Sequence, residues 1–267
     1  MTDTSRTIAI TGAGSGFGRA LAQRYAAAGW KVAISDANAE RAEETLQLIG
    51  GQEQGHLLQQ LDVRETAQWQ QWLNLIEQQW GGLDVLVNNA GVAAGGRLEE
   101  TPLDDWQWIM DIDLMGVVKG CHTFIPLFRR QQRGHIVNIA SFAGLAGAPQ
   151  IAAYGTAKAG VVAMSELIRA ELHDVQVGVS VVCPSFVKTN LLETFRSSNT
   201  KQQGLVERWM ERSSVSADDI ANDIYAAVEN NTFLVLTHRE TRWLWRLKRW
   251  LPGTYFKLMM RSTRGKR

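Results

Sequence analysis

Two side chains that together could move a proton stand four residues apart in the chain. Tyr154 and Lys158 lie in an alanine-rich stretch, residues 151–172, whose pattern predicts a helix. Residues four apart share one face of a helix, so the ammonium group would lie beside the phenol. A phenol ordinarily titrates near pH ~10, and a neighbouring cation favours its ionised form. The pair therefore predicts a proton donor and acceptor that works closer to neutral pH.

A glycine-rich turn from Thr11 to Gly18 predicts a cradle for a dinucleotide, which would complete a hydride-transfer site. The turn falls between a predicted strand and a predicted helix, where backbone N–H groups and the helix dipole hold a pyrophosphate. Its spacing, Gly-x-x-x-Gly-x-Gly, departs from the general Gly-x-Gly-x-x-Gly fingerprint, because Phe17 takes the third-glycine position. The expected cofactor contacts in the turn are Gly12, Ser15, Gly16, Phe17 and Gly18.

Asp36 predicts which dinucleotide the turn would hold. It ends the second predicted strand, 24 residues after Gly12, where a carboxylate accepts hydrogen bonds from the adenosine ribose 2′-hydroxyl and repels a 2′-phosphate. Ser15 and Ala37 are uncharged, and Arg19 and Arg41 are nearby but less well placed to offset that repulsion. The sequence therefore predicts NAD rather than NADP.

The elements that must position these residues alternate along the chain. Short apolar, β-branched runs predict strands, and helix-length segments separate them. This alternation predicts an α/β fold with a doubly wound parallel sheet, buried on both faces, whose ligands bind beyond the carboxyl ends of the strands. The predicted strands are 7–11, 31–36, 56–63, 83–89, 134–141, 178–184 and 233–238.

Several motifs between about residue 6 and residue 238 resemble, in order, those of the short-chain dehydrogenase/reductase (SDR) family. The resemblance implies a single Rossmann domain with a seven-stranded sheet over 1–238, which includes a substrate lid over about 189–214. The charge pattern adds a basic amphipathic tail over 239–267. The motifs are Thr11–Gly18, Asp62-Val63, Asn88-Asn89-Ala90-Gly91, Ser141, Tyr154-x-x-x-Lys158 and the segment from Pro184 to Thr189.

The resemblance also implies an NAD(H)-dependent activity that interconverts a secondary alcohol and a ketone. Tyr154 would be the general acid/base, Ser141 would orient the carbonyl, and Lys158 would bind the nicotinamide ribose and lower the pKa of Tyr154. Asn88 and Asn89 are expected to be mainly structural. No metal is expected. The further implied cofactor contacts are Asp62, Val63, Asn89, Ala90, Gly91, Tyr154, Lys158, Pro184, Val187 and Thr189.

Two positions depart from the family pattern. Ser185 replaces a common glycine, and Asp113, within a predicted helix over 105–128, stands where relatives carry a catalytic asparagine. Aspartate adds charge and loses the amide donor. It could pair with Lys158, slow a proton relay, or be harmless. Asp113 is also the one feature that favours an alternative function, a dinucleotide-binding scaffold or regulator of the same fold with little turnover.

The composition fits one domain in a reducing compartment. The chain has 267 residues, 45% of them hydrophobic, which suffice for one large core. Cys121 and Cys183 stand in apolar sequence, which predicts buried free thiols. Neither a signal peptide nor a run near the ~20 apolar residues of a membrane span is apparent. These observations predict a cytoplasmic protein.

The tail carries a charge of its own. Residues 239–267 hold ten Lys/Arg and one acid, whereas residues 1–238 hold 18 basic and 26 acidic residues. Trp243, Leu247 and Trp250 recur there at helical spacing with arginines beside them, a pattern typical of a helix in peripheral contact with a membrane. Packing over the lid or a sister subunit is an equally weighted alternative. No nucleic acid partner is expected, because the body is acidic.

Two further expectations concern substrate and assembly. The segment 142–151 and the lid, with Leu192, Phe195, Trp209 and Met210, are largely apolar. They predict a small apolar alcohol or ketone as substrate, although ordinary lid packing explains the same residues. Small residues over 157–163 allow close helix packing. Together with the helix 106–128 they predict a homodimer or homotetramer with two-fold symmetry.

Overall fold

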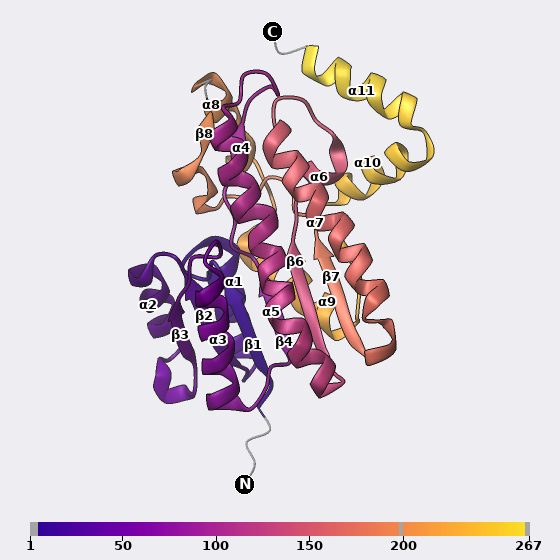
Figure 1. Ribbon diagram of the computed structural model, residues 1–267. Coiled ribbons are helices and arrows are strands. Elements are labelled where there is room, and N and C mark those ends of the chain that lie inside the picture. The colour runs from indigo at the N-terminus through magenta and orange to yellow at the C-terminus, as the bar shows by residue number, and fades with distance from the viewer. Residues whose placement is uncertain (1–4, 198–199, 265–267) are drawn as a thin grey trace.

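A seven-stranded parallel sheet forms the centre of the molecule (Figure 1). The computed structural model describes residues 5–197 and 200–264. The strand order is β3-β2-β1-β4-β6-β7-β9, so the chain winds outward from β1 in both directions. This confirms the predicted doubly wound Rossmann sheet. The strands are β1 Thr7–Thr11, β2 Lys31–Asp36, β3 Leu57–Gln60, β4 Val85–Asn88, β6 Gly134–Ile139, β7 Val177–Val182 and β9 Leu234–Val235.

Helices cover both faces of the sheet, as near-continuous apolar strands require. On one face Trp69, Trp72 and Phe124 pack with ring centroids 5.8–6.4 Å apart, and on the other Tyr25 lies edge-on to Trp30 at 4.8 Å. The first face is covered by α3 Thr66–Trp80, α5 Gly116–Gln131 and α7 Ala152–Glu171, the second by α1 Gly16–Ala27, α2 Ala39–Leu48 and α9 Ala217–Glu229.

Five of the seven strands differ from their predicted bounds, and all five end early at the carboxyl edge. For example, β4 ends at Asn88 and β6 at Ile139, where segments 83–89 and 134–141 were predicted. The residues that follow leave the ladder to form the loops that carry Asn89, Ala90 and Ser141. Pattern alone cannot mark this point, because apolar sequence continues past the last ladder hydrogen bond.

The predicted single helix over 105–128 is instead three consecutive segments. These are α4 Leu103–Ile109, a π-helix Met110–Met115 and α5 Gly116–Gln131. A π turn widens the helix by one residue and is common at functional sites. Asp113 lies in the middle of it, fully buried.

The lid region contains a short 3-10 helix, Asn190–Thr194, a strand β8 Arg196–Ser197 and a helix α8 Thr200–Glu211. Residues 198–199 of the predicted lid lie outside the described residues. β8 pairs in parallel with β5 Ala94–Gly95, a two-residue strand with no sequence signal. Trp209 on α8 packs against Phe186 at 5.0 Å between ring centroids.

Two helices close the described chain, α10 Arg239–Trp250 and α11 Pro252–Arg264, at one end of the molecule (Figure 1). Proline at the first position of α11 fits a helix start. α6 Phe142–Ala146, directly after Ser141, lies against α10. Within residues 5–197 and 200–264, no helix has the length and apolarity to cross a membrane. Both cysteines are buried free thiols, as predicted.

Candidate active site

The four predicted catalytic residues come from three elements. Ser141 follows β6 and is the N-cap of α6, Tyr154 and Lys158 lie on α7, one turn apart, and Asp113 lies in the π-helix. α7 packs against both α6 and the π-helix. The structure therefore places the four side chains together at the carboxyl edge of the sheet, near β6 and β7.

Lys158 is held by two acceptors in the interior. Its Nζ lies 3.3 Å from Asp113 Oδ2 and donates to the Ile139 carbonyl oxygen at 3.1 Å. The other carboxylate oxygen, Asp113 Oδ1, accepts from the Val92 N–H at 2.8 Å. A Cβ at Gly91 would lie 3.3 Å from both Asp113 Oδ1 and Lys158 Nζ, so a glycine keeps room beside this ion pair.

Burial dominates the electrostatics of this cluster. Burial raises the pKa of Tyr154 above its ordinary value; Lys158 lowers it, Asp113 raises it, and a hydrogen bond with Ser141 lowers it. Burial alone would lower the pKa of Lys158, but the Asp113 carboxylate and Tyr154 hold it above its ordinary value. The effect of Lys158 on Tyr154 has the predicted sign. The net direction is the opposite, because burial and Asp113 outweigh it.

Ser141 is oriented by its own loop. Its Oγ accepts a hydrogen bond from the Ala143 N–H at 3.1 Å and donates to the Pro184 carbonyl oxygen at 3.5 Å. The hydroxyl thereby ties the start of α6 to the segment after β7. A carbonyl or hydroxyl oxygen placed between Ser141 and Tyr154 would lie beside two hydroxyl groups, and the Ser141 O–H would turn from the Pro184 carbonyl to donate to it.

The glycine turn is shaped by contacts that larger residues would break. Gly12 has φ +62°, and a Cβ there would lie 2.8 Å from Ala90 Cα; a Cβ at Gly14 would lie 2.8 Å from Asp36 Oδ2. Asn89 braces the turn, since its Nδ2 donates to the Thr11 and Gly12 carbonyl oxygens at 2.8 and 3.1 Å. The turn leads directly into α1, which begins at Gly16. This cradle fits the pyrophosphate of a dinucleotide.

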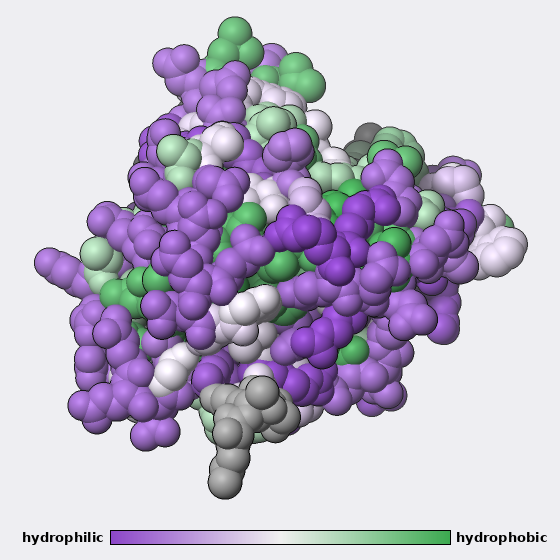
Figure 2. Space-filling model, turned by 60° about the horizontal axis from the view of Figure 1, so that its bottom comes forward, coloured by the Kyte–Doolittle hydropathy of each residue, from purple (hydrophilic) through white to green (hydrophobic). Residues whose placement is uncertain are grey.

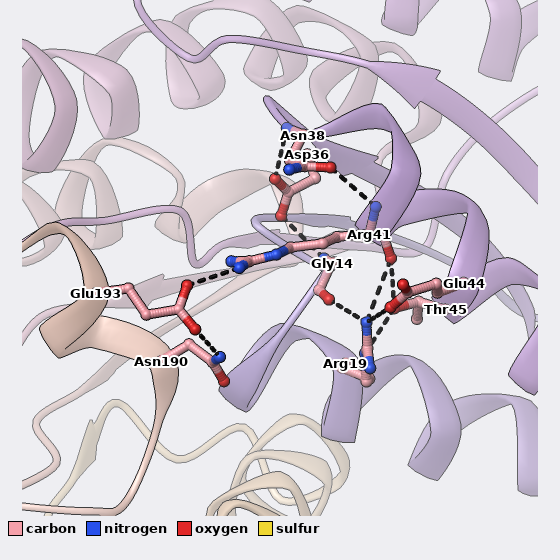
Figure 3. A network of polar contacts seen from close by, with 9 residues as sticks. All are labelled: Gly14, Arg19, Asp36, Asn38, Arg41, Glu44, Thr45, Asn190 and Glu193. Atoms are coloured by element: carbon pink, nitrogen blue, oxygen red, sulfur yellow. Dashed lines mark hydrogen bonds and ion pairs between the residues drawn. The ribbon is translucent and has the colours of Figure 1, made fainter.

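Asp36 lies beside the turn with both carboxylate oxygens engaged (Figure 3). Oδ2 accepts from the Gly14 N–H and Oδ1 from the Asn38 N–H, each at 2.9 Å. Each oxygen keeps a lone pair that a ribose hydroxyl could use. The carboxylate is thus fixed by the backbone at the position where an adenosine ribose would meet the turn.

Arg41 lies near Gly14 and Asp36, since a Cβ at Gly14 would lie 2.8 Å from both Arg41 Cβ and Asp36 Oδ2. It extends from α2 past Gly14 to Glu193 in the 3-10 helix of the lid, at 2.7 Å between Nη2 and Oε2 (Figure 3). Glu193 also accepts from Asn190. This ion pair joins residues 152 apart in the chain, and no local pattern could have indicated it.

Asp62 and Val63, two of the expected cofactor contacts, both have partners within the protein. The Asp62 carboxylate pairs with Arg64, whose Nη2 lies 2.6 Å from Oδ2, and Val63 is buried with its carbonyl oxygen bonded to Trp69 Nε1 at 3.0 Å. Asp62 follows β3 at the same edge as Asp36. An adenine amino group there would share the carboxylate with Arg64.

The segment after β7 faces the glycine turn. A Cβ at Gly16 would lie 3.4 Å from Thr189 Cβ, and Val187 is buried. Ser185 is not among the residues with positive φ, so serine fits this backbone without strain. Next to this segment, a cavity of about 330 Å³ is lined by Ser185, Phe186, Trp209, Arg212, Ser213, Ser214, His238 and Glu240.

Comparison with known proteins gives the class. A family model described as short chain dehydrogenase matches residues 6–200, and this chain belongs to that family of oxidoreductases. A CLA biosynthesis dehydrogenase/reductase from Lactiplantibacillus plantarum is 31% identical over 249 residues, covering 86% of this chain and 87% of that protein. The probable oxidoreductase EphD of Mycobacterium tuberculosis is 31% identical over 92% of this chain, which spans only 43% of EphD.

A comparison with solved structures supports the same family. An SDR from Burkholderia phymatum, in complex with NAD, superposes with a TM-score of 0.85 at 31% identity, covering 93% of this chain and 94% of that one. The family and this neighbour indicate a nicotinamide cofactor.

Proposed function

We propose that this protein is an NAD(H)-dependent oxidoreductase that interconverts a secondary alcohol and a ketone of apolar character. The observation that carries the proposal is the cluster of Ser141, Tyr154 and the buried Lys158–Asp113 pair, which lies at the same sheet edge as a glycine turn with Asp36 beside it. The Burkholderia phymatum relative, which binds NAD, supports the choice of cofactor.

In this proposal the protein residues handle the proton. Bound nicotinamide would supply the hydride acceptor or donor. Tyr154 takes the proton from the alcohol hydroxyl in oxidation and returns it to the ketone oxygen in reduction, while Ser141 donates a hydrogen bond to that oxygen. Lys158 lies in contact distance of Asp113 and the Ile139 carbonyl, which leaves one of its three N–H bonds for a ribose hydroxyl. The same contacts hold it beside Tyr154.

Support for an apolar substrate comes from the segment after β7 and from the lid. Phe186 in that segment packs against Trp209 on α8, and Met210, the next residue of α8, is buried. The test is a screen of alcohols and ketones of increasing apolar size with NAD(H), followed by nicotinamide absorbance. Turnover of apolar secondary alcohols or ketones is expected. Turnover of none of them, despite measured NADH binding, would favour the scaffold function.

Replacing Asp113 by asparagine is expected to move the pH dependence of alcohol oxidation to lower pH. Oxidation needs the Tyr154 phenolate, so kcat/KM rises as pH passes through the pKa of Tyr154. The Asp113 carboxylate raises that pKa, and asparagine removes the charge at nearly the same size. The measurement is kcat/KM against pH. The matched control is Asp111→Asn on the same π-helix, whose carboxylate bonds Gln107 instead. An unmoved midpoint in Asp113→Asn would show that this carboxylate does not tune Tyr154.

Assembly is expected to use α7 and the α4–α5 segment, in a dimer or tetramer with two-fold symmetry. Leu167 on α7 is 65% exposed and Met115 at the end of the π-helix is 41% exposed, so a second copy would cover apolar surface. Leu167→Arg should weaken the dimer on the order of 10²-fold, since both copies lose a buried leucine. Light scattering against concentration measures it, with Leu48→Arg on α2 as the matched exposed-leucine control. A wild type that stays monomeric at micromolar concentration would contradict this assembly.

A further inference from the structure

The two C-terminal helices bond to the body through one face. Trp245 packs against the core, Lys248 Nζ donates to the Leu145 carbonyl oxygen at 2.5 Å, and Tyr255 Oη donates to the Ala146 carbonyl oxygen at 2.9 Å. Trp245 and Lys248 are spaced three apart, so they share a face of α10. The tail therefore lies on α6, the segment that follows Ser141.

The opposite face of α10 carries large apolar side chains that the described residues leave exposed. Trp243 is 57% exposed and Trp250 is 79% exposed, and seven residues of helix bring them to the same side. Of the eleven large hydrophobic side chains exposed among the described residues, five fall in the tail. They are Trp243, Trp250, Leu251, Phe256 and Leu258.

The body has a different surface. The face seen in Figure 2 is mainly hydrophilic, with hydrophobic residues in small groups between charged and polar ones. Scattered apolar residues are normal on a folded protein, whereas a cluster on one element marks an interaction site. The tail is such a cluster, and Figure 1 places it at the edge of the molecule, where a flat partner could reach it.

The charge of the tail indicates the sign of the partner. Residues 239–267 carry ten Lys/Arg and one acid. Four arginines repeat at spacings of three and four on the flank of the tryptophan face, and one of them, Arg242, also donates to the Leu236 carbonyl oxygen at 2.9 Å. The four are Arg239, Arg242, Arg246 and Arg249. An isologous contact between two such tails would bring like charges together, which opposes pairing through this face.

We infer that the outer face of α10–α11 docks on an anionic lipid bilayer. An amphipathic helix with tryptophans on one side and arginines beside them lies in the plane of the membrane interface, with indole rings at headgroup depth and guanidinium groups on lipid phosphates. Neither helix needs to span the bilayer. The inner face keeps its contacts with Leu145 and Ala146 in this orientation.

This orientation also brings α6, the segment that follows Ser141, close to the membrane. α10 separates α6 from the bilayer by one helix, about 10 Å in diameter. If the proposed function holds, an apolar alcohol or ketone dissolved in the bilayer would have a short path to the site. That consequence rests on the proposed function, whereas docking itself does not.

The experiment is co-sedimentation of the full-length protein with vesicles of phosphatidylcholine, with and without phosphatidylglycerol, at low and high salt. Binding is expected to anionic vesicles at low salt and to fall with added salt. Trp243→Ala/Trp250→Ala should weaken binding at least about tenfold, and Arg239→Gln/Arg246→Gln about thirtyfold. Leu48→Ala/Leu98→Ala, two exposed leucines on the body outside the expected oligomer interface, is the matched control and should bind like the wild type.

The readout needs no turnover, so failure of docking and failure of the proposed activity are separate results. Circular dichroism checks that each variant is folded. Absence of sedimentation with anionic vesicles, or equal binding by the wild type and the folded tryptophan variant, would overturn the inference. A third result would also overturn it: the wild type does not bind vesicles, and the tryptophan variant loses its oligomeric state in light scattering. The tryptophan face would then pack against another copy of the chain.

Discussion

Tyr154→Phe is expected to lower turnover on the order of 10²- to 10⁴-fold while NADH still binds. Phenylalanine keeps the ring but removes the only group in the cluster proposed to exchange a proton with substrate. The ion pair of Lys158 with Asp113 and its bond to the Ile139 carbonyl do not involve the phenol, so the site should keep its shape. The measurements are kcat for the best substrate and NADH affinity by fluorescence titration.

The matched control is Tyr225→Phe, which removes a phenol hydroxyl on α9, where the ring packs against Tyr25 at 5.1 Å. This variant should turn over like the wild type. Near-normal turnover of Tyr154→Phe would mean that another group moves the proton, and the proposed mechanism would be wrong. Loss of both turnover and NADH binding would instead indicate damage to the fold, which circular dichroism would reveal.

The sheet was predictable because both of its faces are buried. Strands such as Val85–Asn88 are continuous apolar runs with helix-length segments between them, and this pattern depends only on local sequence. The glycine turn and the Tyr154/Lys158 pair were predictable for a related reason. Their function depends on residues that are only a few positions apart in the chain, and such spacings can be recognised directly in the sequence.

The features that the sequence did not predict depend on contacts between distant segments. The π-helix 110–115 brings Asp113 to the Val92 N–H and to Lys158, and nothing in Met110–Met115 itself marks a widened turn. The raised pKa of Tyr154 follows from burial, which spacing does not report. Similarly, amphipathic spacing predicted the helix at Arg239–Trp250, but the hydrogen bonds that hold it on α6 join residues more than a hundred positions apart.

Cofactor preference offers a second large effect. Asp36→Ala combined with Ala37→Arg is expected to shift the ratio of kcat/KM for NAD(H) over NADP(H) by on the order of 10²- to 10³-fold toward NADP(H). The Asp36 carboxylate is fixed by the Gly14 and Asn38 N–H groups, so it cannot turn away from a 2′-phosphate. Two unit charges about 4 Å apart near a protein surface interact by about 4 kcal/mol, and the double variant exchanges a repulsion for an attraction. Steady-state kinetics with both cofactors measure the shift.

Glu193→Gln tests the same cofactor preference by removing the acidic partner of Arg41. In the wild type the Arg41 guanidinium is paired with Glu193 at 2.7 Å, which offsets its attraction for a phosphate. Removing that carboxylate should raise kcat/KM for NADP(H) and leave NAD(H) less affected, because a ribose hydroxyl carries no charge. The exposed pair Arg130–Glu77 supplies a matched control, Glu77→Gln, on α3. Wild-type kinetics as good with NADP(H) as with NAD(H) would show that Arg41, rather than Asp36, governs the ribose end of the site.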